Sequence, residues 1–115
     1  MNEIKINIIN IVGSPFCVEA DDGQKIYNVI VKSFKEKKKV ILSFLNVKLL
    51  TTAFLNTAIG LLYKDFTEEF IKEHLNIEAM SQSGLISLKR VVETAKLYYK
   101  NPNSIEQSIK DILGE

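Results

Sequence analysis

The sequence has few residues able to form metal or disulfide sites. Cys17 is the only cysteine and His74 the only histidine among 115 residues. No disulfide can therefore form within the chain, and one copy cannot supply a Cys/His zinc site. We interpret Cys17 as a small apolar filler near a loop and His74 as a helix-end residue. We expect no metal, no cofactor and no catalytic set of acid, base and nucleophile.

Phosphate-binding loops and long apolar runs are also missing. The five glycines stand singly, so neither common glycine-rich nucleotide loop is present. No apolar run approaches the roughly 20 residues that span a bilayer, and the N-terminus does not resemble an export signal. Fifteen basic against fourteen acidic residues give a net charge of +1, too weak a field to indicate nucleic acid or an anionic membrane. We expect a cytoplasmic protein that binds neither.

The composition indicates one globular domain. Apolar residues make up 46% of the chain and charged residues 25%, as in ordinary folded proteins. Abundant isoleucine, lysine and asparagine are typical of an AT-rich bacterial genome. We expect residues 1–101 to form the domain and residues 102–115 to add a C-terminal helix after Pro102.

Two strands with a helix between them are expected in the first half of the chain. Apolar residues at every second position from Ile4 predict a strand, which a β-branched run extends to Ile11. Residues 21–39 show apolar residues at four-residue spacing and end in lysines, typical of an amphipathic helix. The apolar run of residues 40–44 predicts a strand at the sheet centre, covered on both faces.

The second half predicts further alternation of helix and strand. The expected elements are a buried helix over residues 51–62, a short helix from Thr67, a strand over 75–79, a long helix over 85–99 and a final amphipathic helix from Ser104. The fold class is thus α/β. We expect a single layered domain, with a mixed sheet of about four strands and helices packed against it.

A pair of hydroxyls precedes the predicted buried helix. Thr51 and Thr52 follow the central strand and a loop containing Asn46 and Lys48. The first amides of a helix lack intrahelical partners, and the dipole is positive there. A phosphoryl group at this position would gain hydrogen bonds and favourable charge.

This segment resembles the STAS domain of anti-sigma-factor antagonists. In that domain an aliphatic strand leads through an x-D-S-S/T-G-x motif into the second helix, and the partner kinase phosphorylates the second hydroxyl. Thr52 corresponds to that hydroxyl and Thr51 to the one before it. Leu50 replaces the acidic residue of the motif, and Ala53 replaces its glycine.

The chain as a whole is more similar still to a STAS-like family of unknown function, over about residues 4–100. The matching features are a glycine-led first helix (Gly23–Ile26), a V-x-L-x-F strand (Val40–Phe44), a loop valine (Val47), a hydroxyl-hydroxyl-small-F-L segment (Thr51–Leu55), a later strand (Leu75–Ala79) and an A-x-x-Y-Y ending (Ala95–Tyr99). The resemblance implies a STAS-like fold.

The resemblance also implies a non-enzymatic protein-interaction and regulatory domain, with a histidine-kinase-like ATPase as the candidate partner. The implied partner-binding residues are Asn46, Lys48, Thr51, Thr52 and Asn56, and the candidate phosphorylation sites are Thr52 and Thr51. A phosphate of about −1.5 to −2 charge would repel an acidic partner surface. The plainer alternative is that the threonines only cap the helix.

Two functions of other classes fit the same sequence. In the first, the helix start holds an anionic metabolite or nucleotide, which would make the protein a small-molecule sensor. In the second, the row formed by Ile105, Ile109 and Ile112 packs against another copy, which would make it a homo-oligomeric structural module.

Overall fold

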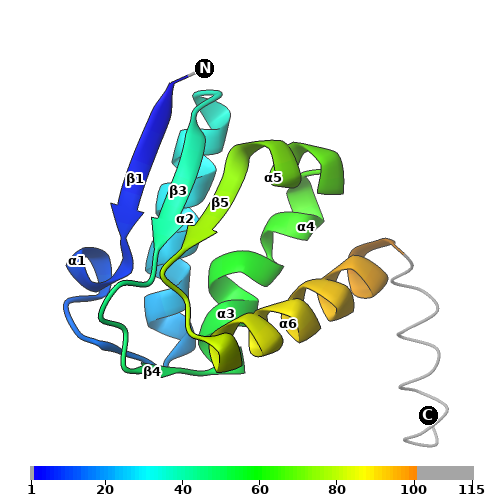
Figure 1. Ribbon diagram of the computed structural model, residues 1–115. Helices are drawn as coiled ribbons and strands as arrows, with labels where there is room; N and C mark the ends of the chain where they lie inside the picture. Colours follow the sequence, from blue (N-terminus) through cyan, green and yellow to red (C-terminus); the bar gives the residue numbers. More distant parts are fainter. Residues whose placement is uncertain (1, 101–115) are drawn as a thin grey trace, which may run out of the picture.

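The computed structural model describes residues 2–100, in which strands alternate with helices (Figure 1). In chain order the elements are β1 (Glu3–Asn7), α1 (Ile8–Val12), β2 (Phe16–Cys17), α2 (Ala20–Lys35), β3 (Lys39–Ser43), β4 (Leu49–Leu50), α3 (Thr52–Leu55), the π-helix η1 (Asn56–Gly60), α4 (Leu62–Asp65), α5 (Glu68–His74), β5 (Leu75–Glu78) and α6 (Gln82–Lys100). The predicted α/β class is confirmed.

The main sheet has three parallel strands in the order β1-β3-β5, with the predicted strand at its centre. The prediction of one mixed sheet of about four strands was wrong in detail. β2 and β4 form a separate parallel pair of two residues each, and every pairing in the described chain is parallel. Strands this short leave no alternating pattern to detect, and the helical connections between neighbouring strands carry the chain back to start in the same direction.

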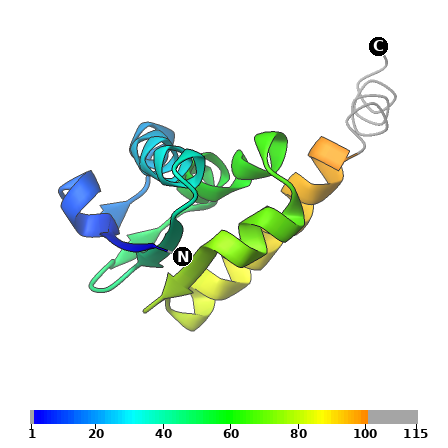
Figure 2. The ribbon, with the colours of Figure 1, turned by 90° about the horizontal axis from the view of Figure 1, so that it is seen from above.

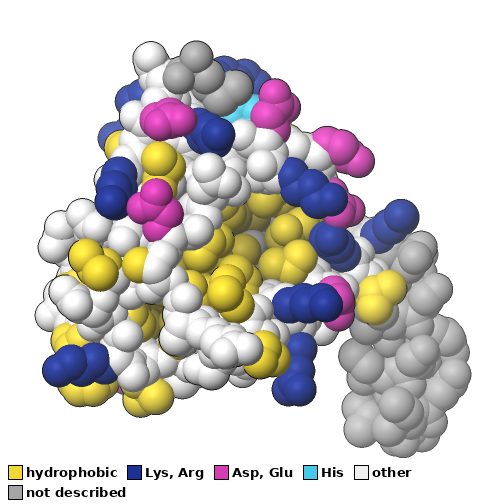
Figure 3. All heavy atoms as spheres, viewed as in Figure 1, with side chains coloured by type: hydrophobic (Ala, Val, Ile, Leu, Met, Phe, Trp, Pro, Cys, Tyr) yellow, Lys and Arg dark blue, Asp and Glu magenta, His cyan; other side chains and the backbone are white. Residues whose placement is uncertain are grey.

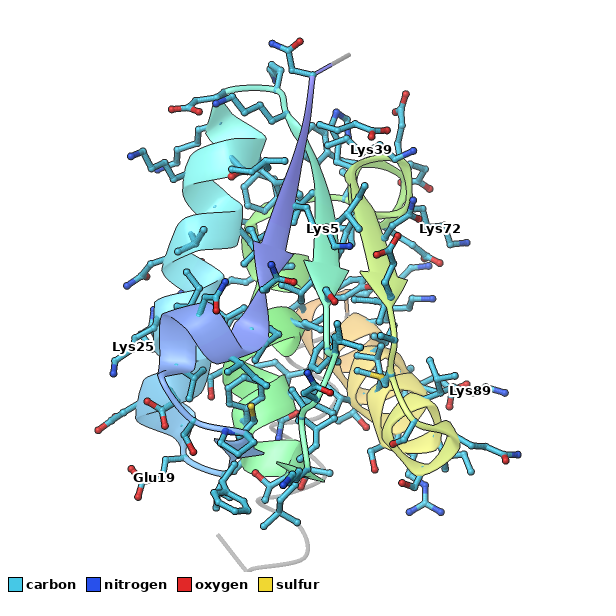
Figure 4. The ribbon with its side chains drawn as sticks, turned by 60° about the vertical axis from the view of Figure 1, so that its left-hand side comes forward. Lys5, Glu19, Lys25, Lys39, Lys72 and Lys89 are labelled. Atoms are coloured by element: carbon cyan, nitrogen blue, oxygen red, sulfur yellow. The ribbon has the colours of Figure 1, made fainter. Side chains whose placement is uncertain are left out.

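Helices cover one face of the main sheet. α2 lies behind the strands in Figure 1 and along one side of them in Figure 2, and it packs against β3. On the other face Lys5 of β1 forms an ion pair with Glu78 of β5, with Nζ and Oε2 3.3 Å apart (Figure 4). Both side chains are about half exposed. The expectation that β3 is covered on both faces was therefore wrong, because the side chains that flank it on this face, Lys5 and Glu78, are charged and exposed to solvent.

The first strand is shorter than predicted. It ends at Asn7, and the β-branched residues that follow form α1, which Gly13 ends in a left-handed conformation. β1 pairs with β3 only as far as Ser43, so longer strand structure would leave backbone groups without partners. Ile8, Ile11 and Val12 are also spaced to share one side of a helix, and all three join the core.

The predicted buried helix over residues 51–62 is one helical stretch in three parts, α3, η1 and α4. The Leu61 amide donates to the Asn56 carbonyl five residues back, which gives the π geometry. α2 packs closely along this stretch at Gly23, where an added Cβ would lie 2.5 Å from the Phe54 carbonyl oxygen. A glycine in the first turn of α2 is what permits this approach.

α6 crosses the other side of the same helical stretch, with Ala95 and Val91 near Gly60. It begins three residues before the predicted start. Between β5 and α6 the surface is hollowed and apolar (Figure 3); Leu75 and Ile77 of β5 and Leu88 and Val92 of α6 are only partly buried. No helix within residues 2–100 has the length and hydropathy needed to cross a membrane. The expected C-terminal helix lies outside the described residues.

His74 is the last residue of α5, as predicted. Its ring stacks on Phe70 with centroids 3.9 Å apart, and its Nδ1 lies 2.9 Å from the Phe70 carbonyl oxygen. Phe34 contacts Phe66 and Phe70 edge-on, and Phe66 stacks on Phe70 with ring centroids 5.4 Å apart. The histidine therefore helps to seal the end of the core.

Candidate functional site

The site lies where the strands of the main sheet end, at the lower side of Figure 1. The chain leaves β3 through the loop of residues 44–48, and it leaves β5 through residues 79–81 to start α6. Open α/β sheets place ligands and partners beyond the carboxyl ends of their strands. The predicted hydroxyl pair follows the first of these loops.

Thr51 is the N-cap of α3. Its Oγ1 accepts a hydrogen bond of 3.2 Å from the Phe54 amide and donates one of 2.6 Å to the Val18 carbonyl. Its own amide donates to the Cys17 carbonyl at 3.1 Å. Thr51 therefore joins the helix start to the end of β2, and its hydroxyl is occupied in both its donor and its acceptor role.

Thr52, the first residue of α3, is exposed. Within residues 2–100 no side-chain hydrogen bond involves its hydroxyl, in contrast to that of Thr51. Asn56 lies four residues further on and is also exposed, so both side chains are on one side of the helical stretch. Of the two threonines, only Thr52 presents a hydroxyl that an enzyme could reach without unfolding the cap.

Asn46 and Lys48 are exposed in the loop before β4. The Val47 amide donates to the Phe44 carbonyl at 3.0 Å, which closes a turn in which Asn46 has a φ of 65°. Asparagine tolerates this left-handed conformation better than most residues. The turn is therefore sufficient to explain why an asparagine occupies position 46. The Lys48 amide donates to the Pro15 carbonyl at 2.8 Å and fixes the loop against β2. No hydrogen bond within the described chain joins either side chain to Thr52.

A cleft of about 240 Å³ adjoins this loop. The side of the cleft formed by residues 80–87 was not predicted from the sequence. Phe44, Val47, Lys48, Leu49 and Leu50 line one side, and Met80, Ser81, Ser83, Gly84 and Ser87 line the other. The Ser81 hydroxyl accepts a hydrogen bond from the Gly84 amide at 3.1 Å and caps α6. The serines that follow the last strand could have indicated this side of the cleft, because the carboxyl ends of parallel strands lie at the same edge of a sheet.

Apolar side chains are unusually exposed on the short β2–β4 pair beside the capped helix. Phe16 is 54% and Leu49 51% exposed, and Val18 is also exposed. Phe16 and Leu49 are register partners across the pair. Exposed apolar groups that cluster beside polar ones are typical of interaction sites.

Beneath this surface Cys17 is fully buried. Burial, with a smaller contribution from the nearby Asp22 carboxylate, raises the pKa of its thiol to about 11. A thiol that stays protonated at neutral pH is a poor nucleophile. Cys17 therefore fills space under the site, in agreement with the interpretation from the sequence.

The parallel sheet, whose central strand leads through a loop and β4 to a capped helix with an exposed hydroxyl, agrees with the STAS-like fold that the sequence resemblance implies. The chain belongs to the family described as STAS-like domain of unknown function (DUF4325), whose profile matches residues 22–85, from the first turn of α2 to the first turn of α6. The predicted resemblance to this STAS-like family is thereby confirmed, over residues 22–85 of the expected range of about 4–100. No curated protein and no solved structure matches the chain.

Proposed function

We propose that this STAS-like domain is a regulatory binding module without chemistry of its own. In this proposal it binds a protein partner through a docking surface made of Thr52, Lys48, Phe16 and Leu49. The observation that supports it most is the exposed Thr52 hydroxyl, which closely follows the exposed Leu49 of β4. Phe16 and Leu49 are already about half buried, so covering the rest of each side chain contributes about 1 kcal/mol.

The partner we propose is an ATPase of histidine-kinase-like fold, on the basis of the resemblance to anti-sigma-factor antagonists. Such a partner would both bind the docking surface and phosphorylate Thr52. The phosphate would add about −1.5 to −2 charge. It would have to lose its water when the adjacent apolar side chains dock, so phosphorylation would release the complex.

The test titrates purified candidate ATPases of histidine-kinase-like fold with this protein by isothermal titration calorimetry. Thr52→Asp should weaken binding about tenfold or more, equivalent to about 1.4 kcal/mol. Thr52→Asn, which has the same shape without the charge, should bind like the wild type. Equal affinity of the two variants would remove the phosphorylation switch from the proposal.

A second pair of variants tests the docking surface itself. Leu49→Asp places a charge among the apolar side chains and should abolish binding. Leu97→Asp is the matched control, because Leu97 is similarly exposed but lies on α6. Wild-type affinity of Leu49→Asp would refute the docking surface, whatever the Thr52 variants do.

A small-molecule sensor is the second candidate, and the cleft beside Lys48 favours it. Three serine side chains and the lysine line a volume of about 240 Å³, slightly below the roughly 300 Å³ of ordinary ligand pockets. A thermal shift with a nucleotide or small anion that Lys48→Ala removes would support this function. The small volume leads us to place it second.

A further inference from the structure

A cavity of about 250 Å³ lies between η1 and the last turns of α6. Asn56, Gly60 and Leu61 line it from the helical stretch, and Thr94, Ala95, Tyr98 and Tyr99 line it from α6. Ionisable groups among the described lining residues are limited to the two tyrosine hydroxyls. Tyr98 and its neighbour Leu97 are exposed at this end of α6. The cavity therefore offers a site for apolar side chains.

The chain continues from Lys100 directly beside this cavity. Asn101 and Pro102 disfavour continuation of α6 in a straight line, because proline lacks an amide hydrogen and restricts the residue before it. The following residues carry an apolar row at four- and three-residue spacing, formed by Ile105, Ile109 and Ile112. Ile105 is five residues beyond Lys100, a reach of up to about 17 Å. A reversal of direction would bring this row to the cavity.

A larger cavity of about 470 Å³ also borders the end of α6, but it suits the row less well. Six charged groups line it, namely Lys64, Asp65, Glu68, Glu69, Lys96 and Lys100. Glu68 Oε1 lies 2.7 Å from Lys96 Nζ, and both groups have solvent contact. Apolar side chains seated there would remove water from charges without replacing its hydrogen bonds.

We propose that residues 104–113 dock on their own chain, with Ile105 and Ile109 seated in the cavity between η1 and α6. The same chain is the favoured source because the short distance from Lys100 keeps the segment at high effective concentration. The segment would thus cover the side of α6 that carries Tyr98, with Leu97 at its margin. This inference is independent of the proposed docking surface.

Paramagnetic NMR on the full-length chain tests the proposal. A single cysteine introduced as Leu97→Cys can carry a nitroxide label selectively, since Cys17 is buried and its thiol pKa is raised to about 11. We expect the amide signals of residues 104–113 to lose most of their intensity. The matched control is Lys64→Cys, which places the label at the charged cavity and should broaden these signals much less.

A mixing experiment distinguishes docking within one chain from docking between two copies. Labelled, isotopically silent protein is added to ¹⁵N protein without a label. Broadening of residues 104–113 in this mixture would show that a second copy supplies the segment, and would overturn the proposal. Absence of broadening, or stronger broadening from Lys64→Cys, would overturn it as well.

A pair of variants adds a test on the segment itself. Ile109→Asp should abolish the broadening from the Leu97 label, because a carboxylate cannot enter an apolar cavity. Ser108→Asp adds the same charge one position away and should leave the broadening unchanged. Equal effects of the two substitutions would contradict docking through the isoleucine row.

Discussion

Thr51 and Thr52 are adjacent and identical in type, yet they have different environments. Thr51 uses its hydroxyl twice inside the protein, toward the Phe54 amide and the Val18 carbonyl. Thr52 leaves its hydroxyl to solvent. A regulatory modification at Thr52 would therefore leave the cap intact, whereas one at Thr51 would have to break it.

This difference gives a prediction for stability. Thr51→Ala should lower the free energy of unfolding by about 1–2 kcal/mol, because the N-cap and a tie to β2 are lost together. Urea denaturation measures the change, with an unaltered m value showing that the unfolding transition stays the same.

Two control substitutions accompany that measurement. Thr51→Ser keeps the hydroxyl and should retain most of the stability. Thr52→Ala removes only a solvated group and should change stability by no more than about 0.5 kcal/mol. A larger loss from Thr52→Ala than from Thr51→Ala would contradict the assignment of the cap.

At the scale of elements, the contact between α2 and the α3–η1 stretch depends on Gly23. Alanine normally favours a helix over glycine by up to about 1 kcal/mol. Here its Cβ would lie 2.5 Å from the Phe54 carbonyl oxygen and 3.0 Å from Thr57 Cβ. A backbone oxygen cannot move aside as a flexible side chain can, so overpacking should outweigh the propensity gain.

We therefore expect Gly23→Ala to destabilise the protein by about 1–3 kcal/mol, measured by urea denaturation. Gly60→Ala is the matched control in the facing element. Its added Cβ would meet Val91 at 3.5 Å, an ordinary contact, so stability should be unchanged or slightly higher. Equal behaviour of the two alanine variants would show that the close approach at Gly23 does not limit packing.

Sequence periodicity predicted the elements that bury one face over several turns or residues. α2, β3, β5 and α6 each show such a pattern, and each forms close to its expected bounds. The pattern was ambiguous for residues 8–12, because β-branched residues there satisfy both strand and helix spacing. The choice depended on how far β3 extends as a partner, which a local pattern does not contain.

The site was predicted in its first half only. The helix start at Thr51 follows from a strand, a loop and hydroxyls in sequence, all of them local signals. The serines that face Lys48 come from a segment more than 30 residues later, and the two meet because β3 and β5 are parallel neighbours. The π-helix η1 likewise lies where α2 and α6 both pack against one helical stretch. A local sequence pattern contains no information about such contacts between distant segments.

For the molecule as a whole, a buried thiol links folding to alkaline pH. The pKa of Cys17 rises from 9.0 to about 11 in the folded protein. The folded state therefore holds this proton more tightly than the unfolded state does. Between these two values unfolding releases a proton, so raising the pH favours the unfolded state. Below about pH 9 the thiol is protonated in both states and contributes no pH dependence.

Comparison with Cys17→Ala isolates this contribution from the tyrosines, of which Tyr27, Tyr63 and Tyr99 also have raised pKa values through burial. The variant loses packing under β2 to the same extent at every pH. The stability advantage of the wild type over Cys17→Ala should therefore be constant from pH 7 to about 8.5 and shrink steadily toward pH 10.5, as followed by urea denaturation at each pH. A constant advantage across that range would mean that water reaches the thiol and that the β2–β4 pair opens in the folded state.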